Sequence, residues 1–134
     1  MNRKIKVLII EDEEDFCFFV RENLINTGRF DVFVATNGAY GIELARTQEP
    51  DIILLDLMMP EMPGEQVADA LDESPVTRGI PRIFLTALVT REDTGNNVLK
   101  KTGESYFVAK PVRTKELVKA IDTVLRETGY TQDA

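Results

Sequence analysis

Ile52-Ile53-Leu54-Leu55 leads directly into Asp56 in the middle of the chain, and this stretch decides the fold. Four consecutive apolar residues, with no polar residue alternating between them, are typical of a parallel strand that is covered on both faces. Parallel strands of this kind occur in α/β proteins, where helices cover the sheet. A carboxylate directly after such a strand is hard to explain by packing, so we expect Asp56 to have a function.

Outward from this strand, short apolar runs alternate with stretches of helical periodicity. The predicted strands are residues 5–10, 32–35, 52–55, 83–85 and 106–109, and the predicted helices are residues 13–26, 38–47, 64–73, 91–101 and 114–126. These units, joined by right-handed crossovers, predict a doubly wound α/β fold whose five-stranded parallel sheet has helices on both faces. Thr94-Gly95-Asn96-Asn97 is poor in helix formers, so we expect the fourth helix to be short, late or loosely held.

Composition and charge exclude several classes of function. We expect the 134 residues to form one domain, with a core at about 4–126 and a short tail at 128–134. The formal charge of −7 argues against binding of nucleic acid or anionic membranes by this domain. No apolar stretch reaches the ~20 residues of a membrane span, and we expect a cytoplasmic protein. Histidine is absent and Cys17 is the only cysteine, which excludes Ser-His and Cys-His catalysis and histidine-ligated metals.

Polar residues close the predicted strands. Glu11 and Asp12 follow the first strand, Asp56 the third, Thr86 the fourth and Lys110 the fifth. Ligands of open α/β sheets bind at the carboxyl ends of the strands, so these side chains could converge. Three carboxylates together would repel one another unless a hard cation such as Mg²⁺, or Mn²⁺ in its place, lies between them. A carboxylate beside a metal and a lysine can act as a nucleophile toward phosphorus.

Four segments in this order resemble the receiver domains of bacterial two-component response regulators, from about residue 4 to 126. They are Leu8-Ile9-Ile10-Glu11-Asp12, Asp56-Leu57-Met58-Met59-Pro60 with Gly64 following, Leu85-Thr86-Ala87 and Ala109-Lys110-Pro111. The resemblance implies a flavodoxin-like fold with strand order 2-1-3-4-5. It also implies a Mg²⁺-dependent reaction in which a histidine kinase or histidine phosphotransfer protein donates a phosphoryl group to the chain.

The resemblance assigns the metal site and the acceptor residue by residue. It makes Asp56 the phosphoacceptor and Asp12 a direct metal ligand. Glu11 would bind the ion mainly through water, and Met58 would supply its backbone carbonyl. An alternative for the acidic pair is a helix N-terminus, where Asp12 could act as a cap, and the two interpretations are compatible.

The resemblance also implies a switch. Thr86 with the adjacent Ala87 would contact the phosphate, Lys110 would pair with it, and Phe107 would turn inward when Thr86 moves. The alternative for Phe107 is fixed packing in the core, with its neighbour Tyr106 on the opposite face of the sheet. The peptide bond before Pro111 matches a position that is usually cis.

The first predicted helix carries a candidate docking surface. Phe16, Val20 and Leu24 share one stripe and should be buried, whereas Phe18 lies on the opposite side. We expect Cys17, Phe18 and Arg21 to contribute to a surface for the phosphodonor, since this helix contacts the donor domain in the family. The alternative is scattered apolar exposure. Elsewhere, we expect the bulky Met58 and Leu88 side chains to shield the phosphorylated carboxylate from water.

These observations favour a phosphoacceptor switch, either on its own or as part of a longer regulator. It would catalyse only its own phosphorylation and dephosphorylation, act on an unidentified downstream protein, and be a monomer or weak dimer. A haloacid-dehalogenase-like phosphatase is an alternative, but such enzymes place an Asp where this chain has Met58. A phosphorylation-independent interaction module of the same fold is the other alternative.

Overall fold

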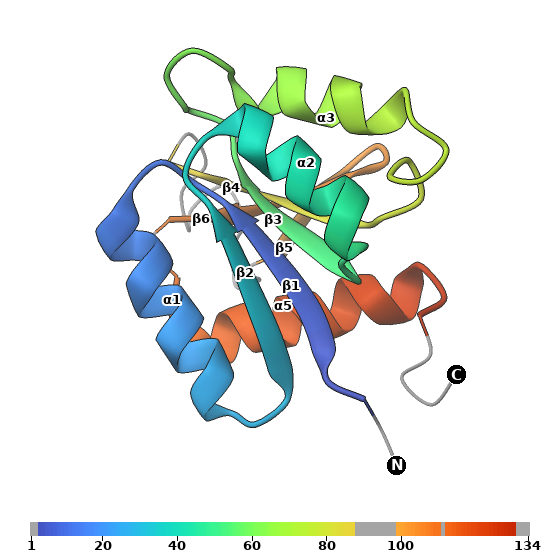
Figure 1. Ribbon diagram of the computed structural model, residues 1–134. Helices are drawn as coiled ribbons and strands as arrows, with labels where there is room; N and C mark the ends of the chain where they lie inside the picture. The colour runs from blue at the N-terminus through green and yellow to red at the C-terminus, as the bar shows by residue number, and fades with distance from the viewer. Residues whose placement is uncertain (1–2, 88–98, 111, 131–134) are drawn as a thin grey trace.

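The computed structural model describes residues 3–87, 99–110 and 112–130, and within them a six-stranded sheet lies between two layers of helices (Figure 1). The strands are β1 (Ile5–Ile10), β2 (Phe30–Ala35), β3 (Ile52–Asp56), β4 (Arg82–Thr86), β5 (Leu99–Thr102) and β6 (Ser105–Ala109). The helices are α1 (Glu14–Asn26), α2 (Gly38–Gln48), α3 (Gly64–Asp72) and α5 (Thr114–Glu127). The strand order is β2-β1-β3-β4-β6-β5.

The predicted fold class is confirmed. The five predicted strands pair in parallel in the order β2-β1-β3-β4-β6, which is the expected order 2-1-3-4-5. Helices α1 and α5 cover one face of this sheet, and α2 and α3 cover the other (Figure 1). All five residues of β3 are buried, as expected for a strand with helices on both sides. No helix among the described residues is both long and apolar enough to cross a membrane.

The fourth predicted helix is wrong where the structure describes it. Residues 99–101 of that range belong to β5, which pairs antiparallel with β6 at the edge of the sheet. Leu99 lies opposite Val108 and packs against the core on the α1 and α5 side, and Gly103, at φ +60°, lies in the turn between the strands. The remainder of the range, with Thr94-Gly95-Asn96-Asn97, lies outside the described residues. For residues 99–101, hairpin pairing therefore takes the place of the predicted helix.

Gly64 places the start of α3 against the end of β3. A Cβ atom built on Gly64 would lie 2.3 Å from the backbone oxygen of Asp56 and 2.8 Å from Cα of Leu57. The Gly64 N–H also donates to the Leu57 carbonyl at 3.1 Å. Only glycine fits this approach without displacing the backbone that carries Asp56, so Gly64 helps to set the position of its carboxylate.

Candidate functional site

The carboxyl ends of the parallel strands bring the predicted polar residues together. Asp56 is the last residue of β3 and lies opposite Leu85 of β4, one position before Thr86. The Lys110 N–H donates to the Thr86 carbonyl at 3.0 Å, which extends the β4–β6 ladder by one residue. Glu11 extends the β1–β2 ladder in the same way, through a bond from its N–H to the Ala35 carbonyl at 3.0 Å. The register of the sheet therefore fixes the backbone position from which each of these side chains extends.

Glu11, Asp12 and Asp56 form a cluster of three carboxylates. One oxygen of each lies within 4.8 Å of the others. Glu11 is fully buried and Asp56 is 3% exposed, whereas Asp12 is half-buried. Burial raises the pKa of Glu11 to about 8, and the neighbouring Asp56 carboxyl adds to this effect, while a hydrogen bond from Lys110 opposes it. Negative charge at this position is therefore costly unless a cation compensates it.

The donor set fits a hard divalent cation. All three clustered side chains offer oxygen, which Mg²⁺ and Mn²⁺ prefer. Oδ1 of Asp56 accepts a hydrogen bond from the Met58 N–H at 3.1 Å, which orients the carboxylate. The Met58 side chain is 62% exposed, so it points away from the core toward the surface beside the cluster.

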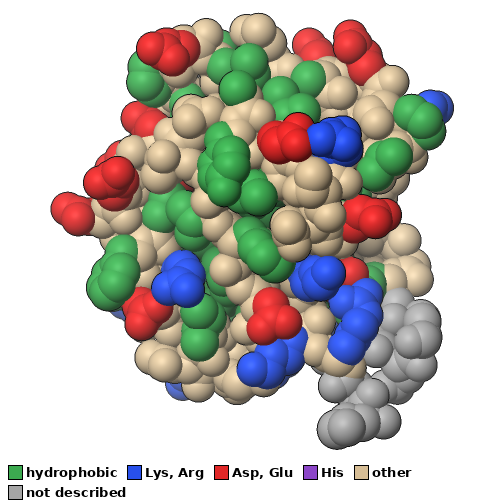
Figure 2. Space-filling model, in the orientation of Figure 1, with side chains coloured by type: hydrophobic (Ala, Val, Ile, Leu, Met, Phe, Trp, Pro, Cys, Tyr) green, Lys and Arg blue, Asp and Glu red, His purple; other side chains and the backbone are tan. Residues whose placement is uncertain are grey.

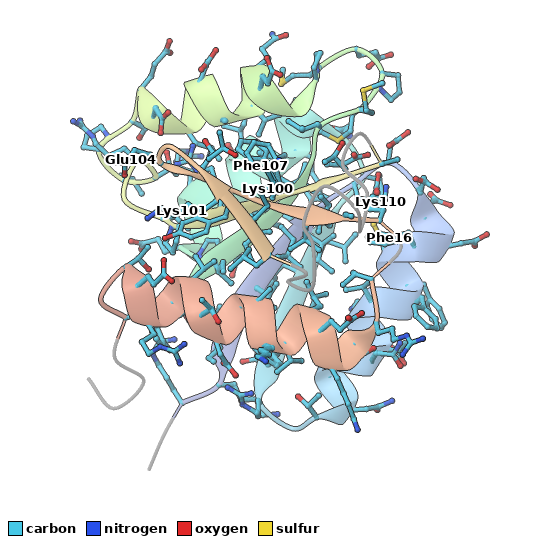
Figure 3. The ribbon with its side chains drawn as sticks, turned by 180° about the vertical axis from the view of Figure 1, so that it is seen from behind. Phe16, Lys100, Lys101, Glu104, Phe107 and Lys110 are labelled. Carbon is cyan, nitrogen blue, oxygen red and sulfur yellow. The ribbon has the colours of Figure 1, made fainter. Side chains whose placement is uncertain are left out.

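Lys110 places a positive charge beside the cluster. Its Nζ donates a hydrogen bond to the carboxylate of Glu11 and another to Oε1 of Glu13, at 2.9 Å. The same Nζ lies 3.8 Å from Oδ2 of Asp56. It also lies 4.7 Å from the centroid of the Phe16 ring (Figure 3). Burial alone would lower the pKa of Lys110, but the hydrogen bonds to the two glutamates outweigh burial and raise it. Lys110 is therefore held as a cation.

Glu13 and Phe16 are the site residues that the sequence prediction missed. Glu13 was expected only as the first residue of a helix, and Phe16 only as part of its buried stripe. Phe16 is half-buried and packs against the core, and its ring also contacts Lys110. Their position in the sequence could have identified them, because both residues lie within about one helical turn of the acidic pair at the end of β1.

The predicted switch residues lie along β4 and β6. Thr86 is 1% exposed at the end of β4, and the adjacent Ala87 is exposed. The Phe107 ring is half-buried and stacks on Phe84, with 5.3 Å between ring centroids and 27° between ring planes. Tyr106 packs in the core on the opposite face, as predicted. Pro111, whose peptide bond was expected to be cis, and Leu88 lie outside the described residues.

The candidate docking surface on α1 needs one correction. Phe18 is 66% exposed and Arg21 is exposed, but Cys17 is only 3% exposed. The Cys17 thiol donates to the Glu11 carbonyl at 3.2 Å, and burial raises the pKa of the thiol to about 12. Helical geometry explains the error, because Cys17 is three residues before the buried Val20 and shares its stripe. Cys17 therefore supports the strand end from inside and offers no surface to a partner.

Phe19 replaces Cys17 on this surface. It is 61% exposed, next to Phe18, so two aromatic rings reach solvent on one side of α1. On the face of the molecule shown in Figure 2, hydrophobic side chains reach the surface among acidic and basic ones. Large exposed apolar side chains that are adjacent in this way are typical of interaction sites.

The family model of the response regulator receiver domain matches residues 7–122. Among curated relatives, the alkaline phosphatase synthesis transcriptional regulatory protein PhoP of Bacillus subtilis is 30% identical over 96% of this chain and 50% of that protein. The probable transcriptional regulatory protein TcrX of Mycobacterium tuberculosis is 35% identical over 97% of this chain and 53% of that protein. The chain thus spans about half the length of these relatives. Protein PilH of Pseudomonas aeruginosa is 32% identical over 90% of this chain and 97% of its own length.

Solved structures agree in fold. Vibrio cholerae chemotaxis protein CheY4 superposes with a TM-score of 0.76 at 23% identity, over 92% of this chain and all of that one. The receiver domain of Francisella response regulator 1452 gives a TM-score of 0.74 at 27% identity, over 93% of this chain and 99% of that one. These likenesses show the fold, and the family match together with the likeness to PilH shows that the chain belongs to the receiver domains of two-component response regulators.

Proposed function

We propose that Asp56 accepts a phosphoryl group from a histidine kinase or a histidine phosphotransfer protein in a reaction that requires Mg²⁺. One observation carries the proposal: the nearly buried Asp56 carboxylate belongs to the acidic cluster that fits a cation, and its Oδ2 lies 3.8 Å from the Lys110 ammonium. A buried carboxylate flanked in this way is suited to phosphoryl transfer, because positive charge on both sides can stabilise the transferring group.

In the proposed transfer, an oxygen of Asp56 attacks the phosphorus of a phosphohistidine. The bond between phosphorus and the imidazole nitrogen breaks, its electron pair stays on the nitrogen, and an acyl phosphate forms on Asp56. Lys110, released from Glu13, pairs with one phosphoryl oxygen. When bound, the divalent ion neutralises negative charge on the cluster and on the phosphoryl group. Its proposed ligands are Asp12 and Asp56 directly, the Met58 carbonyl, and Glu11 through water.

The proposed switch connects this site to Phe107 on β6, the strand next to β4. The Thr86 hydroxyl and the Ala87 backbone would contact the phosphoryl group at the end of β4. Phe107 lies on the adjacent strand and stacks on Phe84, so a movement of Thr86 would leave space toward which the Phe107 ring could turn. We propose that a downstream protein binds the altered surface, with the chain in the cytoplasm and acting as a monomer or weak dimer.

The chain would turn over no external substrate beyond its phosphodonor. A haloacid-dehalogenase-like phosphatase would need an acid two residues after the nucleophile, and Met58 occupies that position. A steady-state assay with phosphomonoesters should give no turnover above that of Asp56→Asn. Sustained turnover would favour the phosphatase instead.

The central test is intact-mass measurement after incubation with acetyl phosphate and Mg²⁺. The chain should gain one phosphoryl group, and Asp56→Asn should gain none. Circular dichroism of Asp56→Asn provides the control for folding. A chain that gains no mass while it remains folded would instead support a phosphorylation-independent interaction module.

A further inference from the structure

Strand β5 forms the last strand of the sheet and leaves one of its edges unpaired within the described part of the chain. Its four residues pair antiparallel with β6, from Leu99 opposite Val108 to Thr102 opposite Ser105. In the strand order of the described residues, β5 has a neighbour on one side only. Figure 3 shows this hairpin from behind, with Lys100, Lys101 and Glu104 along it.

The ladder determines which β5 peptide groups point outward. Lys110 donates its N–H to β4, and alternation along β6 then directs the peptide groups of Tyr106 and Val108 to the same side. The intervening residues, Ser105 and Phe107, face β5. Their partners across the hairpin are Thr102 and Lys100, which exchange hydrogen bonds with β6 in an antiparallel ladder.

Leu99 and Lys101 therefore direct their N–H and C=O groups away from β6. These two residues lie opposite the β6 residues that bond to β4, and they form the non-hydrogen-bonded pairs of the antiparallel ladder. Their four backbone groups offer the hydrogen-bonding pattern of one more strand. An extended peptide that pairs with such an edge gains backbone hydrogen bonds without any change in the sheet.

The charge on the β5 edge limits which kind of peptide strand can pair with it. The chain has a formal charge of −7, yet Lys100 and Lys101 are adjacent on this edge. Successive side chains lie on opposite faces of a strand: Lys100 is beside Phe107 on the α2 and α3 side, and Lys101 lies over the Tyr106 ring on the other side. Lys101 is half-exposed, and its Nζ is 4.0 Å from Glu127. An added strand would thus meet a lysine on each face.

A second copy of this chain is a poor occupant, because pairing β5 with itself would place lysines close to lysines, and like charges across strands are destabilising. Lysines on edge strands also discourage pairing with neutral or basic strands. We propose that the β5 edge binds a partner protein by strand addition, and that the partner contributes an extended segment rich in Asp or Glu. This surface lies one strand from Phe107, but binding at it does not require phosphorylation.

The test uses the full ¹⁵N-labelled chain and two synthetic hexapeptides, one alternating Glu with Thr and the other Lys with Thr. The acidic peptide should shift the amide resonances of Leu99 and Lys101 in a saturable manner, and the basic peptide should not. Lys101→Pro removes an outward N–H and leaves the β5–β6 bonds intact, so it should weaken binding roughly tenfold, the equivalent of one or two backbone hydrogen bonds.

Matched variants separate backbone from charge. Lys101→Gln keeps the N–H and should weaken binding less than Lys101→Pro. Lys100→Glu should reduce affinity for the acidic peptide and increase it for the basic one. Retained nuclear Overhauser contacts between β5 and β6 in each variant establish that the hairpin is intact.

Several results would overturn the proposal. They are absence of binding, shifts centred elsewhere, equal affinity of Lys101→Pro and Lys101→Gln, or β5 shifts that depend on protein concentration without peptide, which would indicate self-association. Asp56→Asn should bind the acidic peptide with unchanged affinity. If Asp56 is not phosphorylated, the proposal for peptide binding at β5 still stands. If the acidic peptide does not bind, the proposal for phosphorylation of Asp56 still stands.

Discussion

The ammonium group of Lys110 has several partners in the candidate site. It contacts Glu11, Glu13 and the face of Phe16, and it remains 3.8 Å from Asp56. Glu11 is buried, whereas the Glu13 side chain is 64% exposed. Of the two carboxylates, Glu13 is the one that can separate from Lys110 and be solvated by water at little cost. We infer that Glu13 would compete for Lys110 with a phosphoryl group on Asp56.

We expect Glu13→Gln to accelerate phosphorylation by acetyl phosphate. The variant weakens one contact of Lys110, and because exposed ion pairs are worth up to about 1 kcal/mol, the increase in rate should be at most about fivefold. A time course of intact mass measures it. Glu14→Gln, the neighbouring exposed glutamate, provides the matched control. A rate equal to or below that of the control would show that Glu13 helps to position Lys110 rather than to retain it.

The sequence correctly predicted the place of those candidate site residues whose position is fixed by the end of a strand. Asp56, Thr86 and Lys110 are brought together by the register of the sheet, which follows from the order of the strands. Glu13 was not recognised as a site residue, and Cys17 was wrongly assigned to the surface, because the direction of a helical side chain depends on how the helix is rotated against the sheet. A shift of one residue in the buried stripe changes which side chains reach the surface.

At the scale of elements, the junction between β3 and α3 depends on Gly64. We expect Gly64→Ala to reduce the free energy of unfolding by about 1–3 kcal/mol, the usual cost of overpacking, because the new Cβ would overlap the Asp56 carbonyl. Urea denaturation measures this loss. Gly79→Ala is the matched control, since a Cβ at Gly79 meets nothing within 4 Å. Equal stability of the two variants would mean that α3 can move away from β3 without cost.

Helix α1, which follows the acidic pair along the chain, presents Phe18 and Phe19 to solvent. Phe18→Ser should slow phosphotransfer from the cognate kinase and leave the rate with acetyl phosphate unchanged, because only the macromolecular donor needs the surface. Val76→Ser, which removes an exposed apolar side chain elsewhere, is the control. Equal rates of kinase-dependent transfer in the wild type and Phe18→Ser would remove α1 from the docking surface.

The five parallel strands were predicted and the hairpin was not, for a physical reason. Ile52-Ile53-Leu54-Leu55 has no alternation, and this pattern has one interpretation in an α/β protein. Leu99-Lys100-Lys101-Thr102 has no such pattern. Its conformation comes from pairing with β6, a tertiary interaction that outweighs local propensity. The position of the segment after the fourth strand suggested a crossover helix, and that expectation came from topology.

At the scale of the whole molecule, the acidic cluster adds to an already negative chain. The net charge is −7, and three of the carboxylates lie within a few ångströms of one another at one end of the sheet. Their repulsion opposes folding in the absence of a cation. A bound divalent ion removes this repulsion and interacts only with the folded arrangement, so its binding free energy adds to stability.

We therefore expect Mg²⁺ to raise the melting temperature at constant ionic strength. At tenfold excess over its Kd, the ion should add about 1.4 kcal/mol. Asp12→Asn should be more stable than the wild type without Mg²⁺ and should lose most of the Mg²⁺-dependent increase. Asp15→Asn on the exposed side of α1 should behave as the wild type. Differential scanning calorimetry measures the melting temperature of each variant with and without Mg²⁺. If Mg²⁺ raised the melting temperature of Asp12→Asn as much as that of the wild type, Asp12 would not be a metal ligand.

The β5–β6 hairpin also affects how the chain finds its fold. Leu99 and Val108 are nine positions apart, whereas β6 reaches its parallel partner β4 across a much longer segment. The entropy lost in closing a loop increases with its length, so β6 gains its antiparallel neighbour at a lower cost than its parallel one. The C-terminal part of the sheet thus has a local pairing of its own, which a crossover helix in the same place would not provide.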